Sequence, residues 1–135
     1  MNGIRRHLAQ PPISRRGAVL TATVLTVVAV VHLIDGPAAL NDQFYIGALE
    51  LSLAVACIPL AILLIIDPMR DLWIAVVGLT TLALACYIAS RTTGLPGATD
   101  DIGNWKETLG ILNMATELIV IVIATRAVVV HRGKR

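Results

Sequence analysis

Two glutamates, Glu50 and Glu117, lie within long apolar stretches of this sequence that have the length of membrane-spanning helices. An ionisable side chain inside hydrocarbon is costly, so such residues usually mark a ligand site, a proton path or a required pairing with another charge. The neighbouring stretches add further polar side chains at comparable depth, which are His32, Tyr87, Arg91 and Asn113. These residue types define a candidate site but do not fix its chemistry.

Two readings of this polar set stay open. In a structural polar core, both glutamates would accept hydrogen bonds from the donors around them, namely Arg91, Tyr87 and Asn113, and the pairing would fix one arrangement of the helices. In a binding site that faces outward, the same carboxylates would hold a cationic or hydrogen-bonding small molecule, or take up and release protons. Either reading requires the polar residues of different helices to meet.

A bound metal or other cofactor is a narrower form of the binding-site reading. His32, Glu50 and Glu117 offer ligand types that zinc, manganese or iron accept, but no two of them stand at i, i+3 or i, i+4 on one helix. Haem ligation by two histidines would need a second histidine inside the membrane, whereas His7 and His131 flank the apolar stretches. The cofactor is therefore left unassigned.

No motif of a catalytic centre accompanies the polar set. Cys57 and Cys86 lie at different depths in different stretches, too far apart for a disulfide, and the sequence has no Cys-x-x-Cys. It also has no phosphate-binding glycine loop and no hydrolase nucleophile elbow. Enzymatic activity is thus undecided, and a non-enzymatic role is favoured.

The elements that must position these residues follow from composition. Apolar residues make up 56% of the 135 residues and charged residues only 15%, well below the share in soluble domains. Four apolar stretches each have the roughly 17–25 residues that cross hydrocarbon as a helix. We therefore predict an all-α four-helix bundle, a single membrane domain over residues 1–135, with spans near 17–34, 43–66, 69–92 and 105–130 and an outer loop at 92–104.

The basic residues predict how the bundle is oriented. With the N-terminus inside, nine of the 11 Lys and Arg residues fall on or near the cytoplasmic side, and only Arg91 and Lys106 fall outside. The positive-inside rule then places both termini in the cytoplasm of a multi-pass protein of the bacterial inner membrane. The basic ends are expected to contact anionic lipid, not nucleic acid.

Capping signals predict the joints between the helices. Asp67 is expected as the N-cap and Pro68 as the first residue of the third helix, which makes the second turn short. Gly94 is expected to end the third helix in the left-handed conformation. Asn104 and Glu107 form a capping-box-like pair at the start of the fourth helix.

The outer loop and the aromatic residues carry two further predictions. The segment Gly-Leu-Pro-Gly at 94–97 favours defined turns, so we expect the loop to form an ordered lid over the outer face. Phe44, Tyr45, Trp73 and Trp105 stand near the ends of the spans, as the aromatic belt of a membrane protein requires.

Helical spacing sorts the polar residues into stripes. The four stripes, one for each span, are Thr21, Leu25, Val28 and His32; Gly47, Glu50, Ala54 and Cys57; Thr80, Leu84, Tyr87 and Arg91; and Gly110, Asn113 and Glu117. Arg91 is the only cation on the outer half of a span, so we predict that it pairs with Glu50 or Glu117 beneath the outer loop.

The string Ser-Arg-Thr-Thr-Gly-Leu-Pro at 90–96 resembles a set of uncharacterised small four-helix bacterial membrane proteins, which carry Ser-Arg-Thr-x-Gly-Leu-Pro after the third span. Those proteins also tend to have a histidine late in the first span and acids in the second and fourth, which His32, Glu50 and Glu117 match. The resemblance covers roughly residues 31–122. It implies a coupled His–Glu–Arg–Glu constellation and lends no activity.

Two functions remain as expectations. Small size and the lack of a soluble domain favour an accessory or assembly subunit of a larger membrane complex, in contact with lipid and with other membrane subunits or copies of itself. The alternative is a protein that binds a small molecule, a metal or protons through Glu50 and Glu117, including a proton-coupled transporter.

Overall fold

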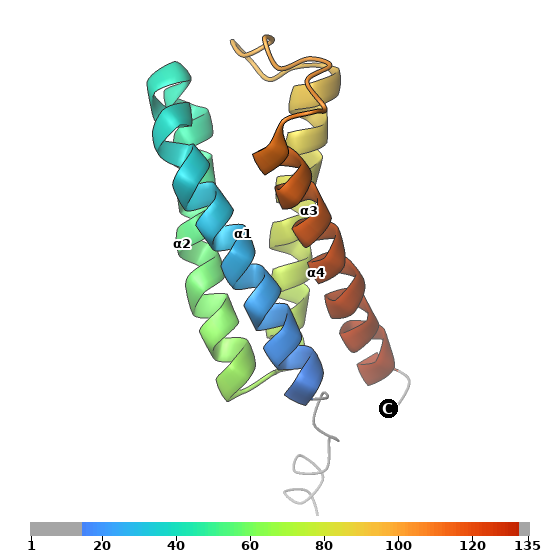
Figure 1. Ribbon diagram of the computed structural model, residues 1–135. Helices are drawn as coiled ribbons and strands as arrows, with labels where there is room; N and C mark the ends of the chain where they lie inside the picture. The colour runs from blue at the N-terminus through green and yellow to red at the C-terminus, as the bar shows by residue number, and fades with distance from the viewer. Residues whose placement is uncertain (1–14, 133–135) are drawn as a thin grey trace, which may run out of the picture.

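A computed structural model describes residues 15–132, which form four α-helices in an up-and-down bundle (Figure 1). The helices are α1 (Arg15–Asp42), α2 (Phe44–Ile66), α3 (Arg70–Thr92) and α4 (Thr108–Arg132). Each of them is long and apolar enough to cross a membrane. The all-α, four-helix prediction is therefore confirmed for this part of the chain, whereas His7 lies outside the described residues.

The helix α1 extends well past the predicted end of the first span near residue 34. It continues through Pro37 to Asp42, and only Gln43 separates it from α2. Its 28 residues give a length of about 42 Å, against ~30 Å of hydrocarbon. A glycine followed by a proline often marks the end of a helix, but α1 continues through Gly36 and Pro37, where it packs against α2.

That packing depends on two glycines near the α1–α2 turn. A Cβ atom built on Gly47 would lie 2.6 Å from the Cα atom of Leu40, and one built on Gly36 would lie 2.8 Å from the side chain of Leu51. The two backbones thus approach as closely as small residues allow in membrane helices. The contact between α1 and α2 is the most extensive in the bundle, and that between α2 and α3 is the least.

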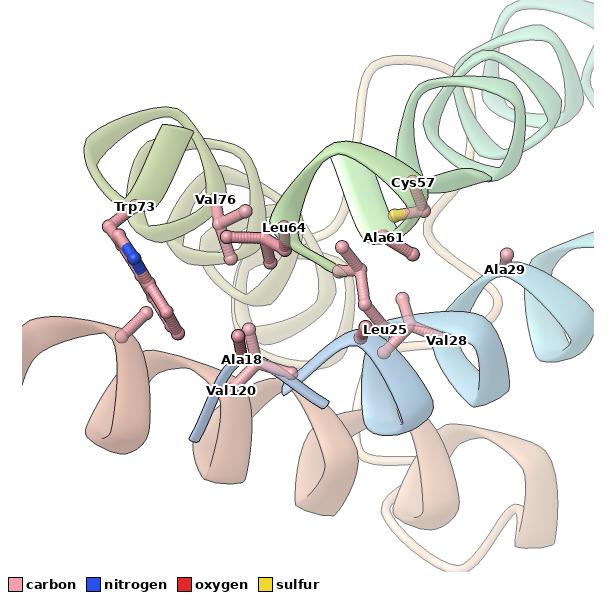
Figure 2. Close-up of a cluster of buried hydrophobic side chains, with 12 residues drawn as sticks. Ala18, Leu25, Val28, Ala29, Cys57, Ala61, Leu64, Trp73, Val76 and Val120 are labelled. Atoms are coloured by element: carbon pink, nitrogen blue, oxygen red, sulfur yellow. The ribbon is translucent and has the colours of Figure 1, made fainter. Parts of the chain in front are cut away.

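The apolar core fills the end of the bundle opposite the 93–107 loop. All four helices contribute to it, with buried side chains from Ala18, Ala22, Leu25, Val28, Ala29, Cys57, Ala61, Leu64, Trp73, Val76, Val120 and Ala124. Figure 2 shows Trp73 and Val76 of α3 and Leu64 of α2 directed toward side chains of α1 and α4.

The prediction that Trp73 belongs to an interfacial aromatic belt is wrong. Its side chain is fully buried, because Trp73, Val76 and Thr80 follow one another at helical spacing on the single face of α3 that packs inward. Phe44 and Trp105, in contrast, are exposed near the loop end, as a belt requires.

The capping predictions for α3 and α4 are also wrong. Asp67 ends α2, where its N–H donates to the carbonyl of Leu63 at 2.9 Å, and α3 begins only at Arg70. The N-cap of α3 is instead Met69, which has extended backbone and forms no side-chain cap. At the other joint, α4 begins at Thr108 and not near Asn104, so no capping box forms there.

The loop after α3 consists of defined turns. Gly94 has φ +77°, which confirms its predicted left-handed conformation. Leu95 and Ala98 exchange backbone hydrogen bonds of 2.8–2.9 Å. The loop is attached to the start of α2, because the Gln43 amide donates to the carbonyl of Gly97 and the Tyr45 hydroxyl to that of Pro96, both at 2.7 Å.

Candidate functional site

The structure divides the predicted site residues into two groups. The first lies inside the bundle and consists of His32 of α1 with Asn113 and Glu117 of α4. The His32 Nε2 atom is 3.6 Å from Glu117 Oε1, and the Asn113 side-chain amide donates to the same oxygen at 3.4 Å. All three side chains are buried, and Glu117 is 0% exposed. We call this group the inner cluster.

Helix periodicity explains how the inner cluster comes together. On α1, the predicted stripe of Thr21, Leu25, Val28 and His32 is buried throughout its length. On α4, the residues of the stripe that ends at Glu117 are buried as well. Because α1 and α4 pack against each other, the two stripes face inward and bring imidazole and carboxylate together.

The inner cluster is poorly satisfied by hydrogen bonds. Within residues 15–132, Glu117 Oε2 and Asn113 Oδ1 are buried and lack a hydrogen-bond partner, and His32 Nε2 has only Glu117 Oε1 near it, at 3.6 Å. Buried polar atoms in folded proteins nearly always have a partner in protein or water, and each exception calls for an explanation. The incomplete pairing of these atoms distinguishes the inner cluster from a fully hydrogen-bonded polar core.

The second group surrounds Arg91 at the loop end of α3. Its guanidinium forms an ion pair with Glu107 and another with Asp101, the latter at 2.5 Å, and it lies 5.0 Å from the centroid of the Tyr87 ring. The guanidinium is buried, whereas Asp101 remains half exposed. We call these four residues the loop clasp.

The prediction that Arg91 pairs with Glu50 or Glu117 is therefore wrong. The backbone N–H of Gly103 donates to the Arg91 carbonyl at 2.8 Å, which folds the loop back so that its own acids reach the guanidinium. Glu117 lies ten positions beyond Glu107, or about 15 Å deeper along α4. Pairing at the loop end leaves the acids partly hydrated, which costs less than pairing at that depth.

Tyr87 belongs to the loop clasp through its ring. Its ring packs edge-to-face on Trp105, with the centroids 6.3 Å apart. It also lies against Gly110, since a Cβ atom there would be 2.8 Å from Tyr87 Cε2. The absence of a side chain at Gly110 thus admits the aromatic ring between α3 and α4.

Glu50 lies between the two groups. It is half-buried, and its Oε2 atom is buried without a hydrogen-bond partner in the described chain. The charged groups that act on it are Asp35 and His32 of α1, Glu107 before α4 and Arg91 of α3. Glu50 therefore lies within electrostatic range of both groups without forming an ion pair with either among residues 15–132.

The metal reading gains no support from the geometry. No three His, Cys, Asp or Glu side chains among residues 15–132 form a group that could hold an ion, so His32, Glu50 and Glu117 are not gathered as a ligand set. Both cysteines are free, with Cys57 buried and Cys86 exposed.

The sequence analysis missed four residues that shape this end of the molecule. Gln43 and Tyr45 hold the loop, and no pattern in the sequence indicated it. Asp101 and Glu107 neutralise Arg91, although Glu107 was interpreted as a helix cap. The available signal was the three acids that follow Arg91 within 16 residues, Asp100, Asp101 and Glu107.

Comparison with known proteins adds no assignment, since no protein-family model, no curated protein and no solved structure matches this chain.

Proposed function

We propose that this chain is a non-enzymatic, multi-pass protein of the bacterial inner membrane that binds protons, or a small ligand with hydrogen-bond donors, at the inner cluster. The observation that carries the proposal is Glu117. Its carboxyl group is fully buried within a span, one oxygen has no partner, and the other has only a long hydrogen bond and a histidine at 3.6 Å. Ionisable groups in such positions mark proton or ligand sites.

The unpaired atoms also indicate what kind of ligand fits. Glu117 Oε2, Asn113 Oδ1 and Glu50 Oε2 are oxygens of acceptor type, while His32 Nε2 either donates or accepts according to its tautomer. A cluster rich in acceptors attracts donors, which are a proton, a water molecule or an ammonium group. An anionic ligand would meet two carboxyl groups and is disfavoured.

Substitution of Glu117 tests this proposal. Because Glu117→Leu removes the only acceptor near the Asn113 amide and His32, we expect it to lower the free energy of unfolding by no more than about 1–3 kcal/mol. Glu117→Gln should remove the infrared band of a protonated carboxyl group that the wild type gains as pH falls. Thermal unfolding in detergent and pH-difference infrared spectra are the two measurements.

Asp71→Asn, at an exposed acid in the first turn of α3, is the matched control and should leave that band in place. A loss of several kcal/mol in Glu117→Leu, combined with no titrating band in the wild type, would assign Glu117 to a structural network instead.

The proposed orientation has its own test. The skew of basic residues supports cytoplasmic termini. A topology reporter fused after the C-terminus should read cytoplasmic, and one inserted near Thr99 in the loop should read external. An external signal from the C-terminal fusion would reverse the side from which the site is reached.

A second candidate function is that of an accessory or assembly subunit. It is favoured by α3, which buries only Trp73, Val76, Thr80 and Arg91 among its 23 residues. Gly78 lies on the outward face of that helix with open space around it. A membrane partner that co-purifies in mild detergent at fixed ratio, and is lost in Gly78→Leu, would support this role; purification of the chain alone would count against it.

A further inference from the structure

The register of α1 against α2 orders the polar groups by depth. A Cβ atom at Gly36 would lie 3.6 Å from the backbone nitrogen of Leu51, so residue 36 of α1 stands beside residue 51 of α2. Glu50 precedes Leu51 and so lies one residue nearer the loop on α2. His32 lies one helical turn, about 6 Å, deeper than Gly36 on α1. From the loop toward the middle of the bundle, the polar groups therefore follow in the order loop clasp, Glu50, and His32 with Glu117.

The opposite direction is closed by apolar side chains. Beyond His32 and Glu117 the interior is filled by the core drawn in Figure 2, whose members are at most 5% exposed. The buried polar residues at that level of α1 and α3 are Thr21 and Thr80, which do not titrate near neutral pH. Cys57 of α2 is itself a buried member of this core.

From this arrangement we infer that Glu50 is the relay residue through which protons reach the inner cluster. The protons enter from the loop-bearing face of the bundle alone. The inference rests on the proposed function and adds the route that protons take and the face of the bundle from which they enter. A proton leaves hydronium at the loop face, is held on the Glu50 carboxylate and passes to the His32–Glu117 pair. Release reverses these steps, and only O–H and N–H bonds are made or broken.

The surroundings of Glu50 suit this role. Glu107 is an acid on the loop side of Glu50, and it favours the arrival of a cation or proton. Asp35 lies one residue deeper than Gly36 on α1 and adds negative charge close to Glu50. Arg91, the one cation that faces Glu50 from α3, is neutralised by its own two acids. His32 acts electrostatically on Glu50 from the deeper side and lies 3.6 Å from Glu117 Oε1, so it stands between the levels of the two carboxyl groups.

The experiment uses the full chain in proteoliposomes of a single orientation, with protons as the probe. The pH is stepped on one face at a time while infrared spectra record the carboxyl band that Glu117→Gln removes. In the wild type, the band should follow a step on the loop-bearing face and not respond to a step on the other face. In Glu50→Gln, the response should slow by at least about tenfold, because a positioned acid–base group is lost, with the final amplitude retained.

Two control variants distinguish a loss of proton transfer through Glu50 from a general disturbance of the structure. Glu50→Asp restores a carboxyl group and should respond within about threefold of the wild-type rate, since acid–base function is retained. Asp35→Asn removes a nearby acid but leaves the Glu50 carboxyl group in place. It should therefore slow the response less than Glu50→Gln.

Three outcomes would overturn the inference. An equal response of the wild type to both faces contradicts the single route, and this arm requires no variant to fold. An unchanged rate in Glu50→Gln contradicts the relay. The absence of any Glu117-dependent band in the wild type would instead remove the proposed function, and the inference with it.

Discussion

Adding one methyl group at Gly47 is expected to destabilise the bundle by about 2–3 kcal/mol, since overpacking forces a close contact apart. The new Cβ atom would lie 2.6 Å from Leu40 Cα and near its amide nitrogen, and these backbone atoms cannot rotate aside. Gly47→Ala should therefore separate α1 from α2 at the loop end. Thermal or denaturant unfolding in a mild detergent gives the measurement.

The same substitution elsewhere provides a matched series. Gly78 lies in the interior of α3 with no atom within 4 Å of a built Cβ, so Gly78→Ala should be neutral or stabilise by up to about 1 kcal/mol through helix propensity. At Gly110 the obstacle is the tip of Tyr87, which can shift, and the cost should fall between the other two. If Gly47→Ala is as stable as Gly78→Ala, the close α1–α2 approach does not exist.

Replacing Arg91 by methionine is expected to cost about 2 kcal/mol, because the charge-assisted hydrogen bonds of the buried guanidinium are lost while the two acids stay partly hydrated. Asp101 and Glu107 would then repel each other at the loop end. Hydrogen exchange at the Gly103 amide, which donates to the Arg91 carbonyl, should accelerate as the loop loosens.

Two further variants test this account. Arg70→Met changes an arginine at the other end of α3 that forms no ion pair among the described residues, and it should stay within about 0.5 kcal/mol of the wild type. The double variant Arg91→Met with Glu107→Gln should recover part of the loss, because one unpaired acid is removed. Simple additivity of the two single effects would refute the ion pair.

Local patterns in the sequence predicted the helices and their inward faces. Apolar runs of sufficient length gave the four spans, and the spacing of polar residues gave the buried stripes that end at His32 and Glu117. These features depend on residues within one or two turns of each other, so one sequence contains the information.

The partners across helices were less predictable. Arg91 was expected to reach inward, but the backbone of the loop brings Asp101 and Glu107 to it. Trp73 was assigned to the interface because of its position near a span end, although the same spacing rule applied to Val76 and Thr80 places it inside. In both cases the tertiary path of the chain decided between two local possibilities.

The same limit applies to the candidate site. Sequence spacing placed His32 and Glu117 on inward faces, but the 3.6 Å contact between them depends on α1 packing against α4, which are distant in sequence. The lack of a partner for Glu117 Oε2 is visible only once all four helices are in place.

The sparse contact between α2 and α3 has a consequence for how the protein is made. The chain consists of two hairpins, α1–α2 and α3–α4, each with extensive internal packing, and the first is complete before the second leaves the ribosome. During that interval His32 lacks the acid that it later contacts, because Glu117 is on α4, the last of the four described helices. The histidine–glutamate contact therefore joins the first and the last of the four described helices, and it can form only after α4 has been synthesised.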